Sequence, residues 1–211
     1  MSKSVLRNTR SRAAVTILLA VLLVFLGFLS CRTGQSTEEV YKNEILALLR
    51  QNRVRTNQLI SSIEKTGKTA DILKWRPGKD RANIGWQLTH IAYREDQMLV
   101  ETLQGQGKDK LAALDEIKAY MDLKHPGDHP PELAVIQWYL GEERRNLQIF
   151  IEGLDFSKID ANTPGERKKP LTYRDALRGL IFHEAHHHGQ AHITFNLYKL
   201  SHGMMDDYNT N

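Results

Sequence analysis

Apolar residues recur at helical spacing in four long segments of the chain. Within each segment the apolar positions are three or four residues apart, which is the spacing of one face of an α-helix. The segments run from about 37 to 67, from 84 to 103, from 131 to 153 and from 172 to 201. A shorter segment of the same character covers 110–123. No stretch alternates as a strand does, so we predict an all-α fold.

Polar residues that stabilise helix starts support these segments. Asn83 stands where an N-cap is expected, and Thr172 with Asp175 has the spacing of a capping box. Residues 68–82 and 154–171 contain proline and glycine and are interpreted as connectors. We therefore predict a four-helix bundle, up-down with a long crossover, plus a short extra helix.

The N-terminal segment 1–31 differs from the rest of the chain. Four basic residues precede an unbroken apolar run from Ala13 to Ser30. Because this run has no polar face, it is not a surface helix of the fold, and it predicts a signal peptide or a membrane anchor. We expect a tether over 32–36, a helical domain over 37–203 and a C-terminal tail over 204–211.

Cys31, the only cysteine, follows the apolar run directly. Phe28-Leu29-Ser30-Cys31 resembles a lipobox, the signal for lipid attachment in bacterial lipoproteins. We favour a lipidated Cys31 over an uncleaved anchor and keep both open. Either one predicts an exported domain, anchored to the membrane and facing the periplasm or the cell exterior, because the basic residues stay inside.

The basic pI of the chain comes from this N-terminal segment. The whole chain has 29 Lys and Arg against 25 Asp and Glu. Lys3, Arg7, Arg10 and Arg12 belong to the segment, which has no acid, so 25 of each sign remain after it. The net charge therefore gives no support for nucleic-acid binding, and no nucleic-acid partner is expected.

Five of the nine histidines fall within residues 183–192, on the last predicted helix. His183 and His187 are four residues apart and so lie on the same side of the helix. Two imidazoles one turn apart can bind a single cation. The alternative is a solvated helix face that happens to be rich in histidine, and we favour the metal site.

His183-Glu184-Ala185-His186-His187 also matches the H-E-x-x-H pattern of zinc metallopeptidases. In those enzymes the glutamate is the general base. The extended pattern requires a glycine and a third histidine, and Gly189 and His192 each stand one residue too early for it. A zinc metallopeptidase is therefore an alternative function, and it requires Glu184 to face the metal.

Two segments resemble a known family. Asn83–Glu95, NIGWQLTHIAYRE, and His183–Gln190, HEAHHHGQ, resemble the second and last helices of the DinB-like (DinB/YfiT) metal-binding superfamily, over roughly residues 38–203. The resemblance implies a four-helix bundle with a divalent-metal site of three histidines. Carried over residue by residue, the metal ligands are His90, His183 and His187.

The resemblance also implies what such a site does. Three imidazoles leave a coordination position open, as in catalytic sites, and suit zinc or nickel. The better understood relatives activate a small thiol, so we expect a metal-dependent transferase or hydrolase acting on a small-molecule substrate. A non-catalytic metal-binding or interaction module at the cell surface is the main alternative. The resemblance assigns no catalytic residue, and a homodimer remains open.

Overall fold

The computed structural model describes residues 36–122, 129–166 and 168–204 of the chain. The described chain is almost entirely helical, and its β-structure consists of one isolated bridge between Asn162 and Thr172. The elements in chain order are α2 (Thr37–Glu64), α3 (Thr69–Lys74), α4 (Ile84–Gln97), the π-helix η1 (Met98–Leu103), η2 (Lys108–Lys110), α5 (Asp115–Met121), α6 (Leu133–Gly153), η3 (Phe156–Lys158) and α7 (Tyr173–Ser201).

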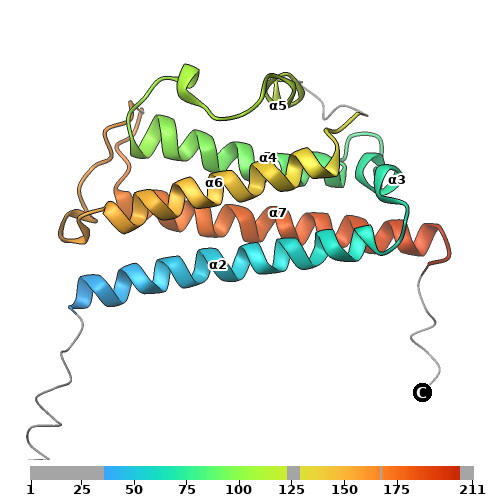
Figure 1. Cartoon of the computed structure of the whole chain (residues 1–211), viewed down its shortest axis with the longest axis horizontal. Helices are drawn as coiled ribbons and strands as arrows, with labels where there is room; N and C mark the ends of the chain where they lie inside the picture. Colours follow the sequence, from blue (N-terminus) through green and yellow to red (C-terminus); the bar gives the residue numbers. More distant parts are fainter. Residues whose placement is uncertain (1–35, 123–128, 167, 205–211) are drawn as a thin grey trace, which may run out of the picture. The chain divides into compact units, whose positions relative to one another are not determined.

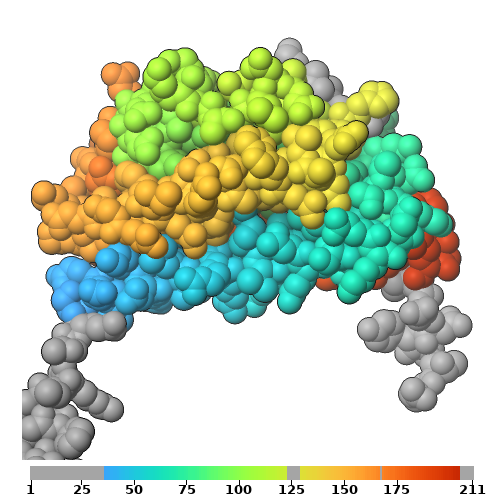
Figure 2. Space-filling view, viewed as in Figure 1, coloured from blue at the N-terminus to red at the C-terminus, as the bar shows by residue number. Residues whose placement is uncertain are grey.

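The four longest helices, α2, α4, α6 and α7, lie side by side (Figure 1). Helices α2 and α7 run in one direction, and α4 and α6 run in the other. The chain returns from the end of α4 to the start of α6 through η2 and α5 (Figure 1 and Figure 2), and α5 packs against α4.

Two apolar clusters, separated by a polar layer, form the interior. One cluster lies around the end of α2 and the start of α4, and the other around the start of α2 and η1. Between them each long helix carries buried polar or charged residues, among them Arg53, Glu95, Arg144 and Glu184. The ionisable groups of the domain therefore meet halfway along the helices.

Two predicted helix starts are confirmed by their side-chain caps. The Asn83 side chain accepts a hydrogen bond from the backbone N–H of Trp86 at 2.7 Å. The Thr172 hydroxyl accepts one from the N–H of Asp175 at 3.1 Å. Both residues satisfy backbone donors that have no partner within the helix.

Three predicted boundaries and one predicted helix type are wrong. The connector 68–82 contains a short helix, α3, because Ile72 and Leu73 bury their side chains in the core. The short helix predicted over 110–123 is regular only from Asp115, as α5. Pro131 lies before the first residue of α6 rather than in its first turn. The last turn of the predicted helix 84–103 is a π-helix rather than an α-helix.

The predicted signal or anchor segment 1–31, with Cys31, and most of the tether and the tail lie outside the described residues. Among the residues that the structure does describe, no helix is both long enough and apolar enough to cross a membrane.

Candidate metal centre

His90, His183 and His187 come together between α4 and α7. One ring nitrogen of each imidazole can be chosen so that all three nitrogens lie within 4.8 Å of one another. The Nε2 atoms of His90 and His183 are 3.1 Å apart. Two nitrogens bound at 2.0–2.1 Å to a tetrahedral zinc ion are roughly 3.3 Å apart, so this pair is close to the spacing that a shared ion requires.

Gln87 and Trp86, one turn before His90 in α4, orient two of the three rings, those of His187 and His90. The Oε1 atom of Gln87 lies 2.5 Å from Nδ1 of His187. When His187 donates the Nδ1 proton to Gln87, its Nε2 lone pair stays free for a metal. The indole of Trp86 is stacked on His90, with ring centres 4.4 Å apart and planes at 11°. The sequence interpretation missed both residues, although the three-residue spacing from Gln87 to His90 signals a shared helix face.

The environment keeps the three imidazoles neutral. Burial, together with the neighbouring His187 and His90, lowers the pKa of His183 to about 3. Burial likewise lowers the pKa of His90 and of His187 to about 4. A neutral imidazole has a lone pair to offer a cation, so the centre is ready to bind metal near neutral pH. His90 and His183 are only partly buried, so the centre is not sealed from solvent.

The other histidines of the cluster lie elsewhere on α7. His186 is exposed, and its Nε2 atom pairs with the Gln190 side chain at 3.0 Å. His188 and His192 contact each other, with ring centres 5.9 Å apart. Among the described residues, the histidines that converge on one point are therefore the three that the family resemblance selected.

Glu184 takes part in a buried ion-pair cluster. Its Oε1 atom accepts hydrogen bonds from Nε of Arg53 at 2.8 Å and from the Thr56 hydroxyl at 3.0 Å. Its Oε2 atom accepts a further bond from Arg144. Burial alone raises the pKa of Glu184, but the two guanidinium charges outweigh burial and hold it below its usual value. Glu184 is therefore a weak base that both arginines hold, unlike the general base of a metallopeptidase.

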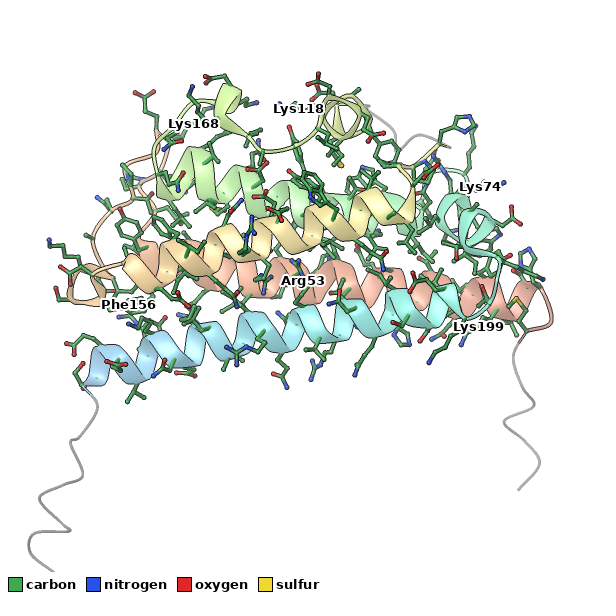
Figure 3. All side chains as sticks on the ribbon, in the orientation of Figure 1. Arg53, Lys74, Lys118, Phe156, Lys168 and Lys199 are labelled. Atoms are coloured by element: carbon green, nitrogen blue, oxygen red, sulfur yellow. The ribbon has the colours of Figure 1, made fainter. Side chains whose placement is uncertain are left out.

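Each of the four long helices contributes one residue to this cluster, which consists of Arg53, Glu95, Arg144 and Glu184. Glu95 accepts from Arg53 at 2.9 Å and from Arg144 at 2.8 and 2.9 Å. The remaining guanidinium N–H groups donate to the backbone carbonyls of Leu140 and Leu49. Figure 3 labels Arg53 midway along α2, on the side facing the other long helices. Two positive and two negative charges thus balance inside the domain.

Two further polar residues of α2, Asn52 and Thr56, are buried beside this cluster. Asn52 and Thr56 are 8% and 0% exposed, so their segment does not turn toward solvent. The Nδ2 atom of Asn52 donates to the carbonyl of Ile181 at 2.8 Å, and Thr56 binds Glu184. Burial of both side chains shows that this face of α2 points into the domain. The sequence signal for this polar layer was Arg53, which lies between Asn52 and Thr56 in a helix whose other inward positions are apolar.

An all-helical domain with a converged histidine triad defines the class of this protein. The family model of the DinB superfamily matches residues 48–191, and the chain belongs to this superfamily. No curated protein sequence matches the chain significantly. A crystal structure of a conserved protein from Enterococcus faecalis has a similar fold, with a TM-score of 0.59 at 15% identity. The similarity covers 74% of this chain and 95% of that protein.

Proposed function

We propose that this protein is a divalent-metal-dependent enzyme acting on a small molecule, with His90, His183 and His187 as the metal ligands. One observation carries the proposal: the three imidazoles converge from two helices about 90 residues apart in sequence, with the Nε2 atoms of His90 and His183 only 3.1 Å apart. In this proposal the four long helices form a bundle around the centre, up-down with a long crossover between α4 and α6.

Several features of the site support a resident metal. Imidazole nitrogens suit zinc and nickel, and three of them leave room for a further ligand. Gln87 holds the third imidazole through its Nδ1 atom, as the outer partners of metal-bound histidines commonly do. Metal-bound sites with an open position and solvent access are typical of catalysis, whereas a structural site is closed by a fourth protein ligand.

A cation bound here would supply Lewis acidity to a substrate group such as a thiol. The residues of the chain contribute binding and positioning. His90, His183 and His187 hold the ion, Gln87 fixes the orientation of His187, and the Trp86 ring restricts rotation of His90. A transferase or hydrolase remains the expected reaction type. The peptidase alternative is disfavoured because Glu184 is bound by Arg53 and Arg144.

The proposal also places the domain outside the cytoplasmic membrane. Its support is the sequence alone, namely the basic residues, the apolar run Ala13–Ser30 and Cys31. Cell fractionation of the full chain tests the location. Radiolabelled fatty acid incorporated into the wild type but not into Cys31→Ala would identify the lipoprotein, and equal incorporation in both would exclude lipidation at Cys31.

The metal site is tested by measuring bound metal in the purified protein. We expect the wild type to contain one divalent ion per chain and His90→Ala, His183→Ala and His187→Ala to lose it. The matched controls are His186→Ala and His192→Ala, which change exposed histidines of the same helix and should keep the metal. Gln87→Leu should weaken metal affinity by about 10–100-fold, because it removes the partner of His187 without removing a ligand.

Two results would overturn parts of this proposal. Full metal occupancy in all three ligand variants would exclude the site itself. Metal loss in those variants, combined with no metal-dependent turnover of any thiol or ester substrate in a broad screen, would favour the non-catalytic module.

A further inference from the structure

We call the ion-pair cluster of Arg53, Glu95, Arg144 and Glu184 the arginine cluster. In both α4 and α6, a second buried ionisable side chain lies one residue away from a member of this cluster. Asp96 follows Glu95, and Glu143 precedes Arg144. Asp96 is 1% exposed and Glu143 is 0% exposed. Successive residues of a helix point about 100° apart, so these two carboxyl groups face a different side from Glu95 and Arg144.

The two carboxyl groups are incompletely satisfied. The Oδ2 atom of Asp96 accepts from the Tyr139 hydroxyl at 2.7 Å and from the N–H of Ala113 at 3.1 Å. The other oxygen of Asp96 and both carboxylate oxygens of Glu143 accept no hydrogen bond of normal geometry among the described residues. Glu143 lies close to Asp96 and Asn146, and it interacts with both of them. Buried charges are normally paired, and the two nearby arginines are already bound to Glu95 and Glu184.

A cavity of about 320 Å³ borders both carboxyl groups. The polar side chains of Gln104 and Asn146 and the apolar side chains of Val100 and Phe150 also line it. Val100 belongs to η1, the π-helix that interrupts the end of α4. Single turns of π-helix inside longer helices are frequent at functional sites. The cavity is therefore bordered both by the π-helix and by the two buried carboxyl groups.

The charge of the pair defines the ligand that it suits. Burial, together with the charges of Asp96 and Glu95, raises the pKa of Glu143 to about 8. Burial also raises the pKa of Asp96, against the hydrogen bond from Tyr139. A cationic group beside the two carboxyl groups would lower both pKa values and balance their negative charge.

We propose that this cavity binds a small organic cation, whose ammonium or guanidinium group pairs with Asp96 and Glu143 while its aliphatic part contacts Val100 and Phe150. The apolar side chains of Leu99, Val100 and Phe150 offer no ligand to a calcium ion, which binds oxygen atoms, but they suit the aliphatic part of an organic cation. Lys110 also lines the cavity, but its Nζ atom pairs with Asp109 at 3.2 Å.

Calorimetric titration of the full-length protein with methylguanidinium and with propylammonium tests this site. We expect saturable binding to the wild type at about pH 8.5, and binding that is at least about 10-fold weaker in Glu143→Gln, because a charge-assisted hydrogen bond is lost. The matched control is Glu152→Gln, an exposed glutamate of the same helix, which should bind as the wild type does. Propanol, which lacks the charge, should not bind.

A second variant guards against misfolding of Glu143→Gln. Ile149 is 61% exposed and lines the same cavity, so Ile149→Lys places a competing ammonium at the cavity without disturbing the core. This variant should also weaken binding. Equal affinity in wild type and Ile149→Lys, no saturable binding to the wild type, or binding of Mg²⁺ or Ca²⁺ that excludes the organic cations would each overturn the proposal. The test needs no metal at the histidine centre, so it stands apart from the proposed function.

Discussion

The domain buries two pairs of carboxyl groups in opposite surroundings. Glu95 and Glu184 form the compensated pair, and Asp96 and Glu143 form the uncompensated pair. Glu95 and Glu184 face Arg53 and Arg144, and every oxygen of the two carboxylates accepts at least one guanidinium hydrogen bond. Asp96 and Glu143 bind no arginine among the described residues, and three of their four oxygens accept no hydrogen bond of normal geometry there. The arginines hold the pKa of Glu184 below its usual value, whereas burial raises the pKa of Glu143.

This difference teaches that burial alone does not decide what a carboxylate does. All four groups are at most 2% exposed, so they pay similar desolvation penalties. What separates them is the number of donors within reach, which lowers the pKa of one group and leaves that of another raised. Carboxylates bound by arginines are typical of a structural ion-pair cluster. Buried carboxyl groups with a raised pKa beside a cavity are typical of a ligand-binding site.

The largest effect is expected from breaking the compensated pair. Arg144→Met removes hydrogen bonds to both Glu95 and Glu184 and leaves two buried carboxylates with one guanidinium. We expect it to lower the free energy of unfolding by about 3–5 kcal/mol. Its matched control is Arg145→Met, which removes a mostly exposed neighbour and should cost less than about 1 kcal/mol. Denaturant unfolding measures both, and equal losses would contradict the difference between the two regions.

An opposite and smaller effect is expected in the uncompensated pair. The pKa of Glu143 is about 8 in the folded chain, against about 4.3 in an unfolded chain, so the folded state binds more protons and loses stability as pH rises between these values. Asp96 and Glu95 on α4 oppose its ionisation, and Lys110 lines the same cavity. Glu143→Gln does not ionise and should be more stable than wild type above about pH 8, by an amount on the order of 2 kcal/mol.

Thermal unfolding of both proteins across this pH range provides the measurement. The difference between Glu143→Gln and the wild type should be small below about pH 4 and complete above about pH 8. A difference that instead grows as pH falls would mean that Glu143 is ionised in the folded protein and has a partner.

The smallest effect concerns the hydrogen bond that the Tyr139 hydroxyl donates to Asp96. Tyr139→Phe removes the hydroxyl that donates to Asp96 and should cost about 1–2 kcal/mol. The control is Tyr173→Phe, at a partly buried tyrosine whose ring stacks on Phe150, where we expect less than about 0.5 kcal/mol. A stabilised Tyr139→Phe would show that Asp96 is already neutral and needs no donor.

Much of the helical fold could be predicted from periodicity and caps. Asn83, Thr172 and the apolar stripes predict the starts and faces of α4 and α7 because these signals are local. The helix α3 escaped prediction since its six residues are too few to show a period. The π-helix escaped because a change in backbone hydrogen bonding leaves little trace in the residue pattern.

The residues of the candidate site also differ in whether the sequence alone could predict them. The spacing of His183 and His187 is local and visible, but His90 needed a family resemblance, because contact between α4 and α7 is a tertiary property. The fate of Glu184 was beyond the sequence for the same reason. Its partners Arg53 and Arg144 are 131 and 40 residues away, and nothing in the short H-E-x-x-H pattern shows that they meet it.

The arginine cluster has a consequence for the alignment of the helices along their axes. One charged residue comes from each long helix, so the hydrogen bonds form only when all four residues stand at one level. A slip of one helix by a single turn, about 5.4 Å, would leave buried charges unpaired. Glu184 adjoins His183, and Glu95 lies about 7.5 Å along α4 from His90. The cluster therefore fixes the heights at which the imidazoles of α4 and α7 meet.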